Sequence, residues 1–524
     1  MRTLFAGATT LSVIVSSAFA QQTPEVPYTA RAFNPAHGDL ARSAGVPARL
    51  ANEAYVEALA RIVYYWGYPA VDQAGRHSMW EIMKAGPGLM FGIAPGGPMN
   101  TTACTADYLA PAQRIVVTPN NDTFYGPGFA DLGKEPSVIQ TPTNAPPGHC
   151  WTVQVVDAFS NVVHQSGSAS GTPGGKFLLV GPDWQGQKPE GFIDILRVPT
   201  NYAGAFARSF APRTLEGKAR AIAVLNETGM YPLSADQQVR RNFDCEATSN
   251  NKVMPPGVTE AMLAADPDLV RPEWVVPGKF WDDLKKVLAA NQATGPGDTA
   301  MADQARALIA LHDTSPAWKA LLNRVALEAD VSLRDSGLYH QVGVGAGNGW
   351  QRQENGGTWG TDWFGRALAA KIYIYVNDYH EAMYLIRGTD AKGALLDGKH
   401  RYTMTFGKDA LPPVDRSRGG FWSLTMYDKD YFMLPKSPNG RTNIGTVSLD
   451  GNQLQFAPDG SLTIHISRDE PTSADARANW LPAPDGQFAL IVRAYVPTQQ
   501  LLAGSYRLPN VERWQEGAAG RALQ

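Results

Sequence analysis

The chain has 524 residues and a formal net charge of −3 at pH 7, with 18% charged and 44% hydrophobic residues. It contains no run of lysines or arginines, which argues against a nucleic-acid partner, and its hydrophobic share argues against intrinsic disorder. Because single hydrophobic cores stop growing at roughly 250–300 residues, we expect more than one domain. Glycine contributes 51 residues and proline 38, as in proteins with many short strands and tight turns.

The N-terminus has the pattern of a secretory signal peptide. Arg2 makes the first segment positive, residues 4–15 are apolar, and residues 18–20 form a small-x-small cleavage site. The apolar stretch is shorter than the roughly 20 residues that span a bilayer, and no later window reaches that length without charges. We therefore expect a signal peptide over 1–20, a mature chain that begins near Gln21, a periplasmic or secreted protein, and no transmembrane segment.

The first periodic segment follows a lead-in without clear pattern, residues 21–48, which we expect to be mobile. Over 49–66, apolar residues recur at helical spacing, and the Gly-Tyr-Pro sequence at 67–69 is expected to end the helix. The apolar stripe of this helix comprises Tyr55, Leu59, Ile62 and Trp66.

From about residue 113 to 199 the periodicity changes to two, which indicates β-strands. Alternating segments at 114–118, 151–158 and 176–181 are separated by turns rich in Gly, Pro and Asn. No helix fits between these strands, so a β-sandwich or jelly roll is expected rather than a parallel sheet with crossover helices. We assign 49–240 to an N-terminal helix plus β-sandwich.

Helical periodicity dominates residues 258–335, and a Gly-rich link at 343–360 and a helix at 362–385 follow. We assign 241–390 to this helical region with its link. The last part, 391–524, returns to short alternating strands and predicts a second β-sandwich. The expected fold class is therefore a multidomain α+β protein with two antiparallel, jelly-roll-like β-sandwich domains and a helical insertion.

Three cysteines allow one disulfide in an oxidising compartment and leave one thiol over. The sequence does not choose among the three pairings of Cys104, Cys150 and Cys245. No histidine motif accompanies any of them, so packing or disulfide roles are favoured over a nucleophilic role.

Three segments resemble known catalytic signatures and fail on detail. The glycines at 343–349 lack G-x-G-x-x-G spacing and a following lysine, which favours a hinge over a nucleotide site. Residues 167–171 have alanine where a nucleophile elbow needs serine. Residues 380–384 read H-E-A-M-Y, with tyrosine in place of the second zinc-binding histidine, which favours a structural helix face.

Two polar strings end strand-like patterns and carry the main functional signal. The first polar string, 116–126, contains Asn120, Asn121 and Asp122, followed by Tyr125. A type I or Asx turn explains one or two of three consecutive amide or carboxylate side chains, but not readily all three. A structural turn and a functional site therefore carry equal weight here.

A second carboxylate, Asp157, ends another strand, and His164 lies just beyond it. If the two strands are neighbours, Asp122, Asp157 and His164 share one edge of the sheet. Such groups suit general acid–base catalysis or a divalent metal ion. A lone histidine is more often a hydrogen-bonded structural residue. Our catalytic candidates are Asp122, Asp157 and Tyr125.

The second polar string, 421–428, reads Phe-Trp-Ser-Leu-Thr-Met-Tyr-Asp. It belongs to a set of segments that resemble two bacterial families. Segments 65–69, 116–132 and 153–183 resemble domain of unknown function 1254. Segments 421–434, 456–463 and 479–486 resemble its usual C-terminal companion, domain of unknown function 1214. The resemblance implies two β-sandwiches with helical additions, usually in exported or envelope proteins, and implies no established reaction.

Two functions remain open. The favoured one is an exported enzyme of hydrolase or lyase type, with a polar or glycan-like substrate, small or polymeric, in a cleft between the sandwiches. The alternative is a non-catalytic ligand-binding or envelope-associated module. The metal requirement and a homo-oligomeric state are left open. The ligand-binding candidates are Asn120, Asn121, His164, Trp422, Tyr427, Asp428, Asn479 and Trp480.

Overall fold

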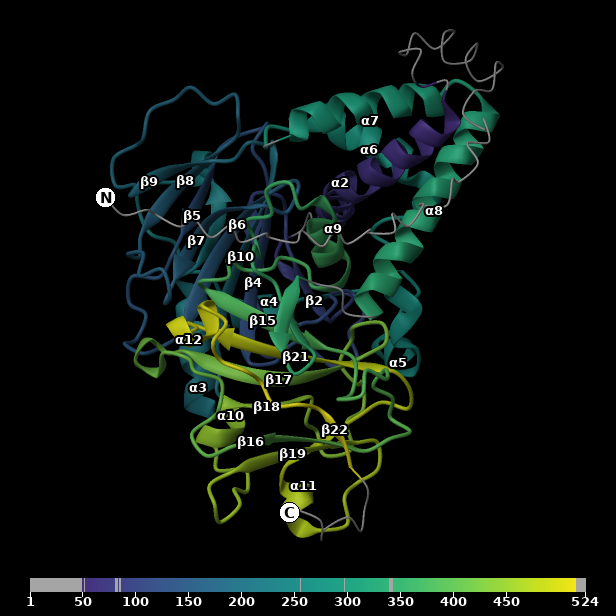
Figure 1. The fold of residues 1–524 in the computed structure, drawn as a ribbon. Coiled ribbons are helices and arrows are strands. Elements are labelled where there is room, and N and C mark those ends of the chain that lie inside the picture. The colour runs from purple at the N-terminus through teal and green to yellow at the C-terminus, as the bar shows by residue number, and fades with distance from the viewer. Residues whose placement is uncertain are drawn as a thin grey trace, which may run out of the picture.

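The computed structural model describes Leu50, 52–80, Met83, 86–254, 256–295, 297–338 and 343–514. The expected signal peptide and the whole of the lead-in lie outside the described residues. Figure 1 shows the N-terminal strands above the C-terminal sheets, with a group of helices beside them. The expected fold class is confirmed at the level of an α+β protein with several largely antiparallel sheets.

Two sheets form the N-terminal region. A five-stranded antiparallel sheet has the order β3-β4-β10-β6-β7, and a four-stranded sheet has the order β11-β5-β8-β9. Apolar side chains of both sheets, such as Phe124, Val155 and Phe177, share one core. The strand bounds are Thr101–Thr102 (β3), Thr123–Asp131 (β4), Ser137–Gln140 (β5), Trp151–Asp157 (β6), Val162–Gly167 (β7), Lys176–Val180 (β8), Asp194–Arg197 (β9), Tyr202–Phe210 (β10) and Gly229–Pro232 (β11).

The predicted strands at 151–158 and 176–181 are confirmed to within a residue. The predicted strand at 114–118 is wrong, because this segment forms a series of bends. Its backbone N–H groups find local side-chain acceptors instead of a neighbouring strand. The side-chain carbonyl of Gln113 accepts from Ile115 N and from Val116 N, at 2.9 and 2.8 Å.

The C-terminal region contains a six-stranded sheet of order β13-β14-β15-β21-β17-β18 and a four-stranded sheet of order β20-β19-β16-β22. Residues such as Met404, Ile464, Leu424 and Val492 form a common core between them. The bounds are Val344–Gly347 (β13), Trp350–Arg352 (β14), Ala382–Arg387 (β15), Tyr402–Phe406 (β16), Phe421–Asp428 (β17), Asn443–Gly445 (β18), Leu462–Ser467 (β19), Trp480–Pro482 (β20), Phe488–Tyr495 (β21) and Glu512–Arg513 (β22). A small third sheet joins Gly88–Met90 (β1), Ala94–Gly96 (β2) and Lys252–Val253 (β12).

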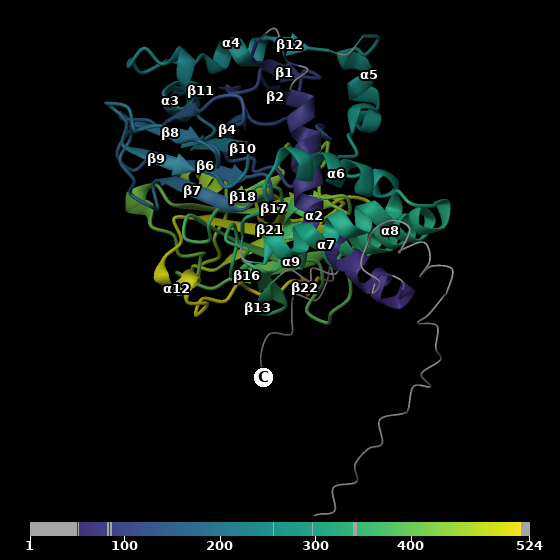
Figure 2. The same ribbon diagram turned by 90° about the horizontal axis from the view of Figure 1, so that it is seen from above.

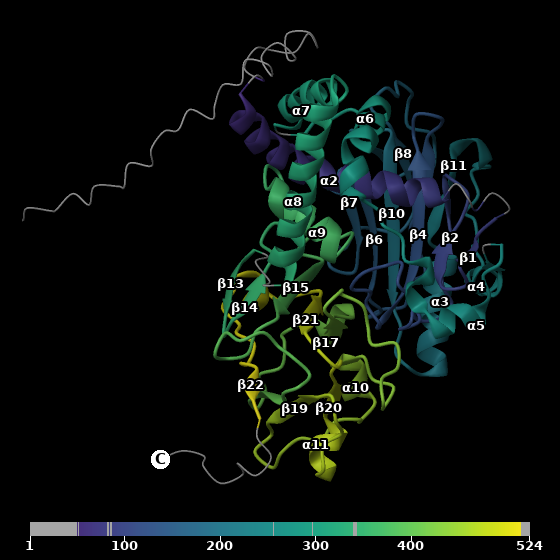
Figure 3. The same cartoon turned by 90° about the vertical axis from the view of Figure 1, so that its right-hand side faces the viewer.

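Helices α2, α6, α7, α8 and α9 pack around one apolar core. Figures 2 and 3 show α2 running from this helical group across the N-terminal strands. The helical region expected at 258–335 is confirmed. The helix bounds are Glu53–Trp80 (α2), Leu215–Asn226 (α3), Cys245–Asn250 (α4), Glu260–Ala265 (α5), Phe280–Ala290 (α6), Asp298–His312 (α7), Pro316–Leu338 (α8), Trp363–Ile372 (α9), Thr446–Asp450 (α10), Ala474–Ala478 (α11) and Gln499–Leu502 (α12).

Helix α2 does not end at the Gly-Tyr-Pro sequence, contrary to our prediction, but continues through Pro69 to Trp80. A proline removes one backbone hydrogen bond of the preceding turn. Here the Arg366 guanidinium donates to the nearby carbonyl of Trp66 at 3.4 Å, and the surrounding turns are buried. The predicted stripe is half right, because Leu59 and Trp66 are buried whereas Tyr55 and Ile62 are exposed.

The predicted helix at 362–385 is too long. Helix α9 ends at Ile372, and the next part of the range forms a turn that leads into β15. Ile374 and Tyr375 adopt left-handed conformations, with φ of 49° and 48°, which end the helix. His380 and Glu381 therefore lie before a strand, and the expected helix face at 380–384 is wrong.

Two of the three cysteines form a disulfide. Cys104, just after β3, is bonded to Cys245 at the start of α4. The leftover thiol, Cys150, is buried, and burial raises its pKa well above the ordinary value. A buried, protonated thiol is a poor nucleophile, which agrees with a packing role.

Candidate functional site

The two polar strings meet at the contact between the N-terminal and C-terminal regions. The hydroxyl of Tyr427, on β17, donates to the carbonyl of Pro119 at 2.6 Å, across 308 residues of sequence. One residue earlier, the carbonyl of Thr118 accepts from Nη2 of Arg493, on β21, at 2.7 Å. Two side chains of the six-stranded C-terminal sheet thus hold the first polar string in place by hydrogen bonds to the backbone carbonyls of that string.

A largely apolar cavity of about 130 Å³ lies beside this contact. Its walls come from the five-stranded sheet, the six-stranded sheet, α2 and the segment after α9. This volume is close to that of apolar cavities that bind benzene, about 150 Å³. The aromatic part of the lining comprises Trp80, Tyr125, Phe129, Phe206, Trp274, Tyr373, Tyr375, Tyr384 and Tyr495.

Three residues on the wall of this cavity have strained backbone conformations. Thr118, Ile374 and Tyr375 line it with φ of 41°, 49° and 48°. Such conformations cost of order 1–3 kcal/mol each and persist only where surrounding contacts impose them. For Thr118 the contacts are hydrogen bonds from its N–H to Tyr431 O and from its hydroxyl to Ile372 O. Strain of this kind clusters at binding and active sites.

Two arginines reach the cavity from inner strands of the two sheets. Arg208 lies on β10 and is paired in register with Tyr125 on β4. Arg493 lies on β21 and is paired in register with Tyr384 on β15. All four side chains line the cavity. Each sheet therefore contributes one guanidinium and one phenol.

Both guanidinium groups are buried and have neutral acceptors. Arg208 donates to Asn377 Oδ1 and to Tyr375 O, both at 2.8 Å, and more weakly to the Gln154 side chain. Arg493 donates to the Thr118 carbonyl and, at 3.4 Å, to a threonine hydroxyl. Neither forms an ion pair with an aspartate or glutamate of the described residues.

A third arginine of the lining is different. Arg76, on α2, forms a buried ion pair with Asp72, with Nε and Oδ2 2.8 Å apart. Its guanidinium also lies 4.5 Å from the ring centre of Trp274. The positive charge of Arg76 is therefore compensated within the protein, whereas the charges of Arg208 and Arg493 are not.

Of the sequence candidates, Asn120 and Tyr125 line the cavity. They contact each other, because the backbone N–H of Asn120 donates to the Tyr125 hydroxyl at 2.8 Å. Asn121 faces the other side of the string, where it lines a polar surface cleft with Arg213. The first polar string therefore lies between the apolar cavity and a more open surface cleft.

Asp122 is buried between the two regions and is not part of the lining of the apolar cavity or of the cleft that Asn121 lines. Its carboxylate accepts from Asn443 Nδ2 at 2.7 Å. Burial raises the pKa of Asp122, while the Ser423 hydroxyl, the Arg213 charge and the Asn443 amide act in the opposite direction. The Asp122 carboxylate therefore links the first polar string to β18 by a hydrogen bond.

Asp122 and Asp157 lie at opposite ends of the five-stranded sheet, so the expected shared edge is wrong. Thr123, next to Asp122, is paired with Phe210 at one end of β10, whereas Asp157 is paired with Ala203 at the other. Strands β4 and β6 run in the same direction. Asp122 lies just before the start of β4 and Asp157 lies at the end of β6, so the two carboxylates are at opposite ends of the sheet.

Asp157 closes the turn between β6 and β7. Its carboxylate accepts from Phe159 N, Asn161 N and Asn161 Nδ2, at 2.8 to 2.9 Å. Burial raises its pKa, and the bonds from Asn161 lower it again in part. His164 bonds the Ser166 hydroxyl and packs on Phe177. Asp122, Asp157 and His164 therefore form no common metal site.

One other group of side chains in the described part of the chain has metal-binding spacing, namely Asp282, His312 and Asp313. Asp313 already bonds Lys285 Nζ at 2.7 Å and the His312 ring at 3.1 Å. The lysine places a positive charge at the position a cation would need, so this group is explained as a surface ion-pair cluster.

The remaining candidates lie within the C-terminal region and do not reach the cavity. Trp422 packs in the core between the two C-terminal sheets. Asp428 accepts backbone N–H groups in the turn after β17. Asn479 bonds the backbone of the loop before β19. Trp480 donates its indole N–H to Ser467 O at 2.9 Å.

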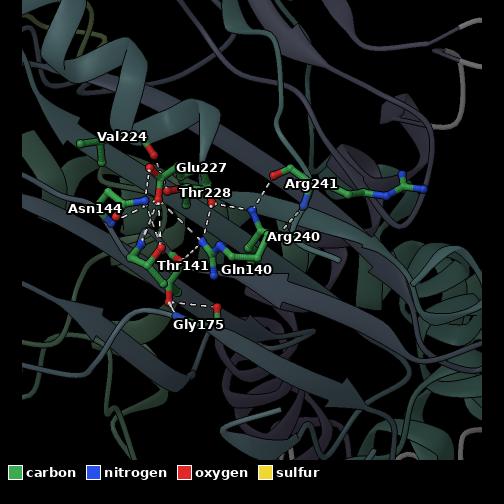
Figure 4. Close-up of polar contacts among 10 residues, drawn as sticks. Gln140, Thr141, Asn144, Gly175, Val224, Glu227, Thr228, Arg240 and Arg241 are labelled. Carbon is green, nitrogen blue, oxygen red and sulfur yellow. Dashed lines mark hydrogen bonds and ion pairs between the residues drawn. The ribbon is translucent and has the colours of Figure 1, made fainter. Parts of the chain in front are cut away.

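A second dense polar cluster lies far from the cavity, between β5, the end of α3 and the segment after β11 (Figure 4). The Gln140 amide donates to the carbonyls of Glu227 and Arg241, both at 2.7 Å, and accepts from Arg241 N at 2.8 Å. Burial alone would raise the pKa of Glu227, yet hydrogen bonds from Asn144 and Thr143 hold it below its ordinary value. Because the polar groups of this cluster form hydrogen bonds with one another, we interpret the cluster as structural.

Comparisons with known proteins agree with this division. Residues 99–232 match the family model described as "Protein of unknown function (DUF1254)", and residues 381–499 match "Protein of unknown function (DUF1214)". No curated protein matches the chain. None of the helices in the described part combines the length and apolarity needed to cross a membrane.

One solved structure shows a similar fold. The VPA0106 protein from Vibrio parahaemolyticus is 21% identical, with a TM-score of 0.54, and the match covers 88% of this chain and 100% of that chain. An uncharacterized protein from Burkholderia cenocepacia is 11% identical, with a TM-score of 0.39, over 92% of this chain and 94% of that one. In this chain the segment that matches DUF1254 precedes the segment that matches DUF1214, in the order that the sequence resemblance indicated.

Proposed function

We propose that this chain is an exported protein that binds a small, mostly apolar organic molecule in the cavity between its DUF1254 and DUF1214 regions. The observation that carries the proposal is the cavity itself, which both regions build at the contact of the two polar strings. Protein interiors are close-packed, so an apolar space with strained walls is unusual unless it serves a ligand.

Export is supported by two independent features. The pattern over residues 1–20 is that of a secretory signal peptide. The disulfide between Cys104 and Cys245 is of the kind that persists in oxidising compartments. Within the same proposal, the two pairs of sheets that share a core support one β-sandwich in each region.

An exported hydrolase or lyase is the second candidate. Burial raises the pKa of both Asp122 and Asp157, as general acids require. Neither carboxylate, however, lines the cavity, and none of its described lining residues is an aspartate or glutamate. A reaction in the cavity would have to use phenols such as Tyr125 and Tyr384. The geometry therefore favours binding over carboxylate-based hydrolysis.

Benzyl alcohol tests the proposal, because it is uncharged and close to the cavity in size. Isothermal calorimetry and thermal unfolding should show that it binds and stabilises the wild-type protein. Val116→Trp fills the cavity from a half-exposed position outside regular structure and should abolish both effects. Val239→Trp makes the same change at an exposed site and should preserve them. Equal binding to both variants would contradict the proposal.

A further inference from the structure

We propose that the ligand of this cavity is an organic monocarboxylate, with an apolar body about the size of one aromatic ring and with its carboxylate bound by Arg493. This inference rests on the proposed function and adds the chemical class of the ligand. It starts from the charge of Arg493, which lies on an inner strand of the six-stranded sheet and is 3% exposed.

A buried charge without a counterion is costly. A guanidinium remains protonated in proteins, so burial cannot neutralise it in the way it neutralises a carboxyl group. The acceptors around Arg493 are the Thr118 carbonyl and the Thr425 hydroxyl, both neutral. Asp122 lies close enough for Arg493 to lower its pKa, but its carboxylate bonds Asn443 and forms no ion pair with Arg493.

Two other buried arginines of the described chain, Arg366 and Arg76, are compensated by acids, whereas the buried Arg387 donates to the Thr389 carbonyl and the Asn510 side chain, both neutral. Arg366 lies 3.5 Å from Asp298, and Arg76 lies 2.8 Å from Asp72. Arg493 differs from Arg387 in that it lines the cavity, whereas Arg387 does not. The missing acid at Arg493, beside an open space, indicates that the counter-charge comes from outside the chain.

Further donors surround the same space. The Tyr384 hydroxyl accepts from Asn377 Nδ2 at 2.7 Å, and Asn377 Oδ1 in turn accepts from Arg208 at 2.8 Å. This leaves the Tyr384 proton to donate. The Tyr125 hydroxyl accepts from Asn120 N at 2.8 Å, and its own contact with Asn120 O, at 3.5 Å, is too long to be a strong bond. Carboxylate oxygens accept from several donors of this kind.

The two guanidinium groups lie near one side chain. Burial raises the pKa of Tyr495 well above its ordinary value, and the charges of Arg208 and Arg493 act in the opposite direction. Tyr495 also lines the cavity. A carboxylate placed against Arg493 would therefore feel the field of Arg208 as well.

The shape and polarity of the cavity select the rest of the ligand. Phe206 and Tyr375 stack with ring centres 3.6 Å apart and form a flat apolar wall. A cavity of about 130 Å³ has room for one ring beside the charged group, but not for a nucleotide or an oligosaccharide. The planar fork of arginine matches a carboxylate in two-point contact, which favours a carboxylate over a small spherical anion.

Benzoate and benzamide provide the direct test, because they share shape and differ in charge. Calorimetry on the full-length mature protein should show benzoate binding about 10- to 100-fold more tightly than benzamide, as expected for charge-assisted hydrogen bonds. Arg493→Met should remove this preference and leave benzamide affinity unchanged. Arg493→Lys should restore part of it. Arg220→Met, on the exposed face of α3, is the matched control and should behave as wild type.

The outcomes separate this inference from the proposed function. If benzoate and benzamide bind wild type equally, or if the preference persists in Arg493→Met, the inference is wrong and the binding cavity stands. If benzoate, benzamide and benzyl alcohol all fail to bind, the proposed function is itself overturned. Circular dichroism checks the fold of the variants, and the wild-type comparison decides the inference even if Arg493→Met does not fold.

Discussion

Two polar regions of this protein have opposite designs. Around Gln140 and Glu227, in Figure 4, donors and acceptors from distant segments meet one another at 2.6 to 3.3 Å. Around the cavity, Arg208 and Arg493 bring two buried positive charges to an apolar space and find neutral acceptors. Buried polar groups that are satisfied within the chain hold the structure. Buried charges that are not compensated, next to open space, indicate a ligand.

The largest effect is expected from breaking the satisfied cluster. Gln140→Met keeps the side-chain size but leaves both backbone groups of Arg241 without their partner, and it leaves the Glu227 carbonyl with only the longer bond from Arg240, at 3.3 Å. At about 1–3 kcal/mol for each buried unsatisfied group, the free energy of unfolding should fall by roughly 3 kcal/mol or more. Urea unfolding followed by tryptophan fluorescence measures this loss.

The control for this variant is Gln187→Met, at an exposed position, which should change the free energy of unfolding by less than about 0.5 kcal/mol. Benzyl alcohol affinity should be unchanged in both proteins under native conditions. A loss below about 1 kcal/mol in Gln140→Met would show that the cluster is not a structural device.

Glu381 is an intermediate case that sharpens the comparison. One carboxylate oxygen accepts from Ala169 N at 3.4 Å, and the other has no hydrogen-bond partner among the described residues. Burial, opposed by backbone hydrogen bonds from Ala169 and Ser170, raises its pKa to about 7. Between pH 4.5 and about 7 the folded state therefore holds a proton that the unfolded state has lost. The contribution of Glu381 to the free energy of unfolding therefore falls as the pH rises through this window.

Glu381→Gln should remove this pH dependence. At pH 8 the variant should be more stable than wild type by roughly 3 kcal/mol, from a shift of about 2.5 pKa units, and the difference should vanish below pH 4.5. Unfolding free energies from pH 4 to 8 test this. A difference that is independent of pH would mean that the carboxyl group does not titrate in this range.

The smallest effect on stability is expected at Arg493. Arg493→Met loses a hydrogen bond to the Thr118 carbonyl but also removes a buried charge, so the unliganded protein should stay within about 1 kcal/mol of wild type. The matched variant Arg366→Met breaks an ion pair with Asp298 and should lose about 3–5 kcal/mol. Equal losses in the two variants would make Arg493 a structural residue.

The sequence located the meeting point of the two regions. Three adjacent amide and carboxylate side chains after a strand-like segment stand out because a single turn does not need them all. Asn120 and Tyr125 do line the cavity, and Tyr427 from the second polar string contacts the first. The specific resemblance of both strings to the two families gave the order of the regions.

Arg208 and Arg493 do not stand out in the sequence, because neither belongs to a cluster of polar residues. In Phe488–Tyr495 a single arginine interrupts an apolar strand, and in Tyr202–Phe210 another does the same. A lone charge in a fully buried strand is a usable signal, since it requires a partner. The pairing of Arg208 with Tyr125, and of Arg493 with Tyr384, depends on the strand register between segments far apart in sequence, which local periodicity does not reveal.

Other errors have the same origin in tertiary structure. From the local sequence we predicted that α2 ends before Pro69, because proline disfavours a helix interior. In the structure, burial and the Arg366 contact outweigh that preference. Asp157 looked like a site residue because a carboxylate ends a strand. Its three hydrogen bonds within one turn are a local structural motif that sequence alone does not distinguish from a site.

A crystal structure of the mature protein grown with benzoate is the most direct test of the central claim. We predict a benzoate ring against Phe206 and Tyr375, with a carboxylate oxygen about 2.8–3.0 Å from the Arg493 guanidinium and a second contact to the Tyr384 hydroxyl. Benzoate bound elsewhere, with the cavity empty or filled by a shifted side chain at a saturating concentration, would contradict it.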